Sequence, residues 1–95
     1  MSANQAYIDK FKAQLDLWTA EINRLEAKAN LADADVRIEM DKQISALRSR
    51  RDAAQDKIAE LQSAGEDVWD DLRTGFEDAW SSLRTGFEDA ASRFQ

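Results

Sequence analysis

The side chains with the clearest chemical potential are carboxylates that occur as adjacent pairs, eleven residues apart. These pairs are Glu66-Asp67, Glu77-Asp78 and Glu88-Asp89. Carboxylate sites for two metal ions in helical bundles also use a Glu-x-x-His motif, and the chain has no His. General acid–base catalysis needs a carboxylate in a dry cleft, and a rod of helix offers no evident cleft. We therefore expect the pairs on a solvated helix face and predict no enzyme activity, no metal site and no cofactor.

The basic cluster of the chain is the stretch Arg48-Ser49-Arg50-Arg51, which could contact phosphate groups. Nearby Asp residues offset its charge, so a solvated flank of a coiled coil explains it better than a nucleic-acid site. The glycines are isolated and form no phosphate-binding loop. The sequence thus predicts no nucleic-acid partner and gives no sign of a small-molecule substrate.

The three tryptophans, Trp18, Trp69 and Trp80, all lie on apolar seams of predicted helices. Packing in a protein core is the simpler explanation. The alternative is anchoring at a bilayer surface, where Trp and Phe of an amphipathic helix can lie. Eleven-residue amphipathic repeats also resemble those of apolipoproteins, although those usually flank the apolar face with Lys, whereas here the flanking cations are single Arg residues.

Composition indicates a helical chain of one domain at most, with 95 residues and neither Pro nor Cys. The formal net charge is −6, and residues 66–95 carry 3 basic and 8 acidic side chains. This acidity disfavours nucleic acid and anionic lipid as partners of that segment. The start of the chain is unlike a signal peptide, and no apolar run is long enough to span a membrane. We expect a cytoplasmic protein, with a peripheral membrane position as the alternative.

The acidic pairs belong to an eleven-residue repeat that covers residues 58–94. Its units read IAELQSAGEDV, WDDLRTGFEDA and WSSLRTGFEDA, followed by ASRF. Eleven residues make three helical turns at about 3.67 residues per turn, which predicts one helix with a continuous apolar stripe. The predicted interface of this C-terminal helix consists of Trp69, Leu72, Phe76, Trp80, Leu83, Phe87 and Phe94.

Gly75 and Gly86 occupy equivalent positions in two units of the repeat. A glycine inside a helix costs roughly 0.5–1 kcal/mol relative to Ala, so the pair needs a reason. One explanation is a close neighbouring helix on that flank. The other is duplication of one tolerated glycine, and the sequence leaves both open.

The first two thirds of the chain carry a heptad seam, with Ser2 as the predicted N-cap of its first helix. Apolar residues step alternately by 3 and 4 up to Val36, which is typical of a coiled coil. The steps then become 4, 4 and 3, which is a stutter in the heptad phase. The predicted oligomer interface consists of Ile8, Phe11, Leu15, Trp18, Ile22, Leu25, Val36, Met40, Ile44, Leu47, Ile58 and Leu61.

Residues 30–35 are the weakest helical stretch of this segment, but they contain neither Gly nor Pro. One interpretation is a continuous helix over residues 3–62, about 90 Å long at 1.5 Å per residue. The other is a helical hairpin that turns at 30–35, which with the last helix makes a three-helix bundle. We prefer the continuous helix, because the seam passes through this stretch without losing phase.

A second break is predicted at residues 63–65. Gly65 is the first glycine of the chain and fits a C′ residue in the left-handed region. The predicted organisation is therefore a heptad coiled-coil segment over residues 1–62 and an amphipathic repeat helix over residues 63–95. The fold class is all-α.

The order of these parts resembles a family of short bacterial coiled-coil proteins, found in cyanobacteria and proteobacteria and described as stress-response proteins. Three stretches carry the resemblance over nearly the whole chain. They are YIDKFKAQLDLWTAEINRLEAKA, QISALRSRRDAAQDKIAELQSAGEDVWDDL and the Trp-containing repeat. The resemblance implies a cytoplasmic, non-enzymatic role linked to stress, with no catalytic residues.

Taken together, these patterns predict a non-enzymatic coiled-coil protein that forms a homo-oligomer, because a lone rod cannot bury both seams. The alternative function is a lipid-surface protein that docks its C-terminal helix on a membrane.

Overall fold

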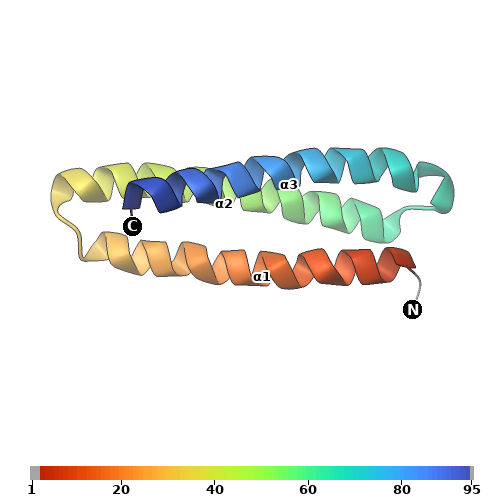
Figure 1. The fold of residues 1–95 in the computed structure, drawn as a ribbon, viewed down its shortest axis with the longest axis horizontal. Coiled ribbons are helices and arrows are strands. Elements are labelled where there is room, and N and C mark those ends of the chain that lie inside the picture. The colour runs from red at the N-terminus through yellow and green to blue at the C-terminus, as the bar shows by residue number, and fades with distance from the viewer. Residues whose placement is uncertain (1–2, 95) are drawn as a thin grey trace.

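The computed structural model describes residues 3–94 as three helices joined by two short connections (Figure 1). The helices are α1 (Ala3–Asn30), α2 (Ala34–Ser63) and α3 (Glu66–Phe94), with no strand among the described residues. The all-α class is confirmed. Ser2, the predicted N-cap, lies outside the described residues, as do Met1 and Gln95.

The preferred prediction of one continuous helix over residues 3–62 is wrong, and the hairpin alternative is confirmed. The chain reverses after Asn30, so that α2 runs antiparallel to α1, and the molecule measures 51 × 21 × 18 Å (Figure 1). A continuous helix of that length would reach about 90 Å. Folding back lets the two halves of the heptad seam pack on each other within one chain.

The reversal occupies Leu31, Ala32 and Asp33 and needs no glycine. The amides of Leu31 and Ala32 donate to carbonyls three residues earlier, which closes α1 with tight turns. Asp33 then takes an extended backbone (φ −62°, ψ 156°), and its carbonyl accepts the first helical hydrogen bond of α2 from Arg37, at 2.8 Å. Asp is a favoured residue type at this position, and Asp35 in the first turn suits the positive end of the helix dipole.

The second break falls on Ala64 and Gly65, within the predicted stretch. The predicted left-handed Gly65 is wrong, because no described residue has a positive φ. Ala64 is extended instead (φ −76°, ψ 140°), and its amide still bonds the carbonyl of Leu61 at 3.2 Å. The carbonyl of Gly65 accepts from Val68 and begins α3. The reversal therefore uses the extended Ala64 and no left-handed glycine.

The core lies along the axis between the helices, and most residues of the predicted oligomer interface are part of it. Nine of those twelve residues are buried against other helices of the same chain: Ile8, Leu15, Ile22, Leu25, Met40, Ile44, Leu47, Ile58 and Leu61. Phe11 and Trp18 are half-buried, and Val36 is 48% exposed. Burial that the sequence assigned to contacts between chains is thus supplied within one chain.

Helix α2 is the central element, because both α1 and α3 pack closely on it. Among the described residues, no Cα atom of α1 comes within 8 Å of one in α3. Large side chains fill the distance between these two helices, as described below. The bundle therefore has two close helix pairs and one wide seam, the seam between α1 and α3.

Candidate functional site

The α1–α3 seam is built from aromatic rings of two helices that are far apart in sequence. Its rings are Tyr7, Phe11 and Trp18 from α1 and Trp69, Phe76, Trp80 and Phe87 from α3. Ring centroids of neighbouring members lie 4.7–6.0 Å apart. Edge and stacked pairs at these distances add about 0.5–1.5 kcal/mol each beyond area burial. The rings therefore attach α3 to α1 although the two backbones stay apart.

One end of the seam is polar at its rim. The hydroxyl of Tyr7 donates a hydrogen bond to the carboxylate of Glu77 at 3.2 Å, while its ring packs edge-on against Trp69 and Phe76. Burial, the hydrogen bond to Glu77 and the negative charge of Glu77 together raise the pKa of Tyr7 to about 12, against the lowering effect of Arg73. Tyr7 is thus a neutral hydrogen-bond donor that links α1 to α3.

The middle of the seam is a stack on Trp18. Its ring lies 4.7 Å from Trp80 and 5.0 Å from Phe87, with interplanar angles of 23° and 28°. Trp80 is buried, whereas Trp18 and Phe87 are only half-buried. One edge of this stack therefore faces solvent in a groove between the helices.

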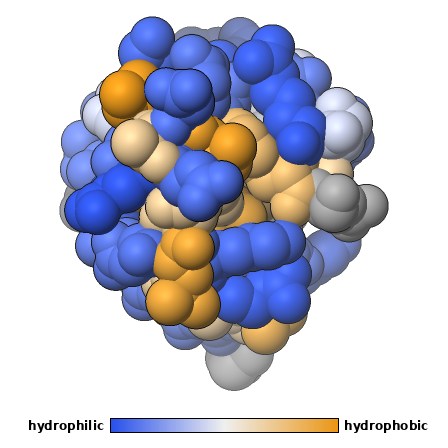
Figure 2. All heavy atoms as spheres, turned by 90° about the vertical axis from the view of Figure 1, so that its left-hand side faces the viewer, coloured by the Kyte–Doolittle hydropathy of each residue, from blue (hydrophilic) through white to orange (hydrophobic). Residues whose placement is uncertain are grey.

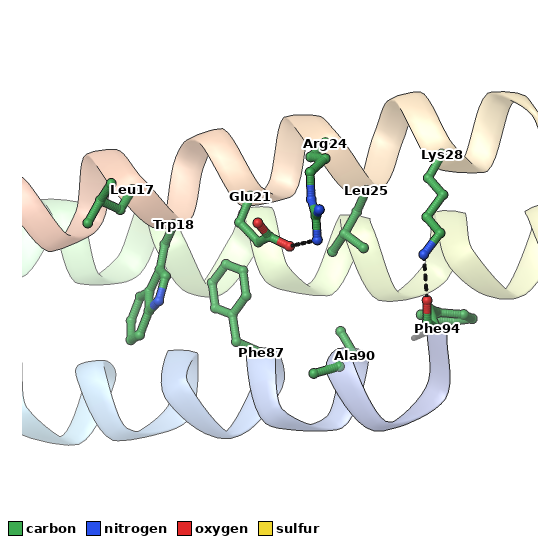
Figure 3. A pocket seen from close by; sticks show the side chains of 10 residues that line it. Leu17, Trp18, Glu21, Arg24, Leu25, Lys28, Phe87, Ala90 and Phe94 are labelled. Atoms are coloured by element: carbon green, nitrogen blue, oxygen red, sulfur yellow. Dashed lines mark hydrogen bonds and ion pairs between the residues drawn. The ribbon is translucent and has the colours of Figure 1, made fainter.

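Beyond the stack, the seam opens into a hollow of about 440 Å³, here called the seam hollow (Figure 3). Figure 3 shows Trp18 and Leu25 of α1 opposite Phe87 and Ala90 of α3, with α2 behind them. The hollow is lined by Leu17, Trp18, Glu21, Arg24, Leu25, Lys28, Phe87, Ala90, Ala91 and Phe94. Its floor is apolar, and its charged residues all come from α1.

A second hollow of about 440 Å³, here called the end hollow, lies where α1 joins α2 and α3 finishes. It is lined by Lys28, Leu31, Ala32, Val36, Met40, Arg93 and Phe94. Figure 2 views this end of the molecule and shows apolar atoms at the surface between polar ones. Lys28 and Phe94 border both hollows, so the two are neighbours along one edge of the bundle.

The cations around these hollows differ in how they are neutralised. Arg24 forms an ion pair with Glu21 at 2.9 Å. Lys28 donates to the backbone carbonyl of Phe94 at 2.9 Å, which satisfies the end of α3 but leaves the ammonium without a carboxylate partner within the described residues. Arg93 likewise has no ion pair in that part of the chain. The rim therefore carries unbalanced positive charge.

The acidic pairs of the repeat line neither hollow, and apart from Glu77, which accepts a hydrogen bond from Tyr7, they lie on the outer face of α3. All six carboxylates are exposed. Within residues 3–94, no group of three or more carboxylates is arranged to hold a metal ion. The same residues include no helix long and apolar enough to cross a membrane. The chemistry that the arrangement offers is binding through apolar surface and cations.

The structure brings together all seven residues of the predicted C-terminal interface. Trp69, Phe76, Trp80 and Leu83 are buried, and Leu72, Phe87 and Phe94 are half-buried against α1 and α2. The sequence missed the partnership of Phe94 with Lys28 and the cations that accompany it. Arg24 and Lys28 follow Glu21 by three and seven residues on one face of α1, and this spacing was the available signal.

Comparison with known proteins gives no relative: no family model, no curated protein and no solved structure matches the chain. The function is therefore inferred from the geometry of the seam.

Proposed function

We propose that this is a non-enzymatic helical-bundle protein, located in the cytoplasm, that binds lipid-like molecules along the α1–α3 seam. The observation that carries the proposal is the seam hollow, whose apolar floor is open to solvent between α1 and α3. Its volume of about 440 Å³ lies in the range of small-molecule sites, about 300–1,000 Å³. Half-buried Trp18 and Phe87 offer stacking and apolar contact at its edge.

The shape of the seam favours an elongated guest. Further depressions continue from the seam hollow toward Tyr7, lined in part by Phe11, Trp80 and Arg84. A flexible hydrocarbon chain can follow such a groove, because apolar burial is non-directional and requires no matching polar groups. A compact polar metabolite would find its partners only among the charged side chains from α1, Glu21, Arg24 and Lys28, since Leu25, Phe87 and Ala90 are apolar.

Tryptophan fluorescence tests the proposal, because Trp18 and Trp80 border the seam. Hexadecanol carrying bromine atoms on its chain should quench the emission saturably, and unlabelled hexadecanol should reverse the quenching. Leu25→Glu would place a carboxylate in the floor of the hollow and should abolish the quenching. Absence of saturable quenching in the wild-type protein would refute the proposal.

The membrane-surface alternative uses the same apolar residues in another way. The stripe of α3 is covered by α1 and α2, so docking on a bilayer would require α3 to leave the bundle. Flotation with phosphatidylcholine vesicles separates the two mechanisms. Binding of monomeric amphiphile without flotation supports the seam site, whereas flotation with loss of the α1–α3 contacts supports docking of α3.

A second candidate function is self-association, with a role in bacterial stress response that rests on the sequence resemblance alone. The observation that favours it is a group of large apolar side chains near the α1–α2 connection. Leu31 is 91% exposed, Ile38 is 55% exposed and Val36 is 48% exposed. Leu31 and Val36 line the end hollow together, and exposed large apolar side chains at one end of a molecule are typical of a contact surface.

Sedimentation equilibrium tests self-association directly. The double variant Leu31→Ser, Val36→Ser should reduce the apparent mass if this end joins two chains. Leu17→Ser is the matched control, since Leu17 is also exposed, at 66%, but lies elsewhere on α1. A wild-type protein that sediments as a monomer at all concentrations would exclude this candidate.

A further inference from the structure

We infer that the ligand class of the seam is a single-chain amphiphile with an anionic head group, typified by a long-chain carboxylate. The hydrocarbon chain lies in the seam hollow toward Trp18, and the head group lies between Lys28 and Arg93. This inference rests on the proposed lipid-binding function and specifies its ligand.

Charge complementarity is the first support. The whole chain has 13 basic and 19 acidic side chains. The lining of the two hollows reverses this ratio, with Arg24, Lys28 and Arg93 against the single carboxylate of Glu21. Because Glu21 is already paired with Arg24 at 2.9 Å, the charges of Lys28 and Arg93 remain available to an anion.

The C-terminal ends of two helices would repel an anion at this site. The size of their partial charges can be compared with the charges of the side chains. The C-terminal ends of α1 and α3 each act as roughly half a negative charge. The nearby start of α2 contributes about half a positive charge in the opposite sense. Among the side chains that line the two hollows, Lys28 and Arg93 contribute two full positive charges, whereas Asp33 and Asp35 at the start of α2 line neither hollow. The lining itself therefore favours a carboxylate over a neutral head group.

The position of Lys28 explains why the head group should be placed at this point. Its ammonium lies at the border between the two hollows, 2.9 Å from the carbonyl oxygen of Phe94 (Figure 3). An ammonium can donate three hydrogen bonds, so Lys28 can keep the carbonyl and still bind a carboxylate oxygen. From there, the apolar floor of Leu25 and Phe87 leads directly to Trp18 (Figure 3).

Phe94 separates the seam hollow from the end hollow at the head-group end of the site. Its half-buried ring is part of the lining of both.

Head-group dependence is measured with palmitate and hexadecanol, which share the chain and differ in charge. Both are titrated below micelle formation, and helicity is followed by circular dichroism to exclude unfolding by detergent. The wild-type protein should bind palmitate about tenfold more tightly than hexadecanol, equivalent to about 1.4 kcal/mol. The ratio should fall as salt is added, since exposed charges are screened.

Variants assign the preference to particular cations. The double variant Lys28→Gln, Arg93→Gln should reduce the palmitate-to-hexadecanol ratio to about one. The matched control is Lys57→Gln, because Lys57 pairs with Glu60 on α2 and lines neither hollow. The control should keep the wild-type ratio.

The outcomes separate the two levels of inference. Equal binding of palmitate and hexadecanol by the wild-type protein would overturn the anionic head group and leave the lipid-binding function standing. A preference that survives in the double variant would also overturn the assignment to Lys28 and Arg93. If neither compound binds, the proposed function fails, and the ligand class fails with it.

Discussion

Residues 69–79 and 80–90 have nearly the same sequence but lie in different surroundings. In the first unit Phe76 is fully buried and Leu72 is half-buried. In the second unit the order is reversed, since Leu83 is fully buried and Phe87 is half-buried on the seam. Equivalent positions of a repeat therefore do not contribute equally to the free energy of unfolding.

The helical period accounts for the reversal. At 3.6 residues per turn, eleven residues advance by about 20° beyond three full turns. The second unit is therefore rotated relative to the first, toward burial of its Leu, Gly and Ala positions. The same rotation carries Phe87 outward, where it stacks on Trp18 and lines the seam hollow.

The largest expected effects come from truncating the large apolar residues of the two units. Phe76→Ala should lower the free energy of unfolding by about 3–5 kcal/mol, and Phe87→Ala by about 1–2 kcal/mol, because Phe87 is only partly buried. For the leucines the order should reverse, with about 2–5 kcal/mol for Leu83→Ala and about 1 kcal/mol for Leu72→Ala. Urea denaturation of the four variants measures these differences. Equal losses within each pair would show that the rotation between units is not real.

The equivalent glycines of the two units, Gly75 and Gly86, also lie in different surroundings, and smaller changes in stability are expected from replacing them. A Cβ on Gly75 would meet nothing within 4 Å, so Gly75→Ala should stabilise the protein by about 0.5–1 kcal/mol through helix propensity. A Cβ on Gly86 would lie 2.6 Å from Arg50 Nη1 and 3.0 Å from Leu47 Cδ2. It would also disturb the 3.2 Å hydrogen bond from Arg50 to the carbonyl of Ser82. Gly86→Ala should therefore destabilise the protein by about 1 kcal/mol.

Thermal melts of the two glycine variants check their opposite signs. Adding Arg50→Ala to Gly86→Ala should recover part of the loss, because the flexible guanidinium is one of the obstructing groups. Both explanations considered for the sequence thus apply, one to each glycine: Gly86 admits α2, and Gly75 has open space beside it. Equal shifts in both variants would contradict this division.

A third difference concerns the acidic position of the two units, because Tyr7 bonds Glu77 and not Glu88. Tyr7 is the single tyrosine of the chain, so tyrosinate absorbance reports its pKa directly. The wild-type midpoint should lie at about 12, above the ordinary tyrosine pKa of 10.0. Glu77→Gln should lower the midpoint, whereas the matched variant Glu88→Gln should leave it unchanged.

The sign of the effect on stability follows from the raised pKa of Tyr7. The stabilisation that the neutral Tyr7 hydroxyl gives to the folded chain is fully present below pH 10.0, where Tyr7 is neutral in both folded and unfolded chains. It is lost as the pH rises from 10.0 to about 12, because the unfolded chain releases its proton first. A midpoint near 10 in the wild-type protein would contradict the hydrogen bond from the half-buried Tyr7 to Glu77.

The smallest expected effect concerns the Arg residue of each unit. Arg73 lies 3.7 Å from Glu77 and 3.8 Å from Asp70, whereas Arg84 has Ser81 in place of that Asp and forms no ion pair within residues 3–94. Arg73→Ala should cost a few tenths of a kcal/mol more than Arg84→Ala. The difference should vanish in high salt, and a difference that persists there would point to packing instead.

The sequence was sufficient for the all-α class, the apolar positions and the break at residues 63–65. It was insufficient for the direction of the chain after Asn30. A heptad seam indicates that one face of a helix is buried. It does not indicate whether the helix that covers this face belongs to another chain or to the same chain. The absence of Gly and Pro favoured a continuous helix, yet Asn30, Asp33 and Asp35 have low helix propensity, and tertiary packing decided the outcome.

The binding site was less predictable than the fold. The aromatic stripe of the last helix was recognised, but its open edge exists only because Trp18 from α1 meets Trp80 and Phe87 from α3. Ring size keeps the two backbones apart, and this distance is a tertiary property. The link between Lys28 and Phe94 spans 66 residues, so the spacing of the charged residues on α1 could indicate the cations but not their partner on α3.

The short connections of the bundle have a consequence for how it folds. Three residues join α1 to α2 and two join α2 to α3, so both close helix pairs can form as local hairpins at low entropic cost. Contacts across the seam instead join residues far apart in the chain, 70 residues in the case of Tyr7 and Glu77. We expect the aromatic rings of the seam to dock last during folding. Their separation is then the first step of unfolding, so amides of α1 and α3 should exchange with solvent sooner than those of α2.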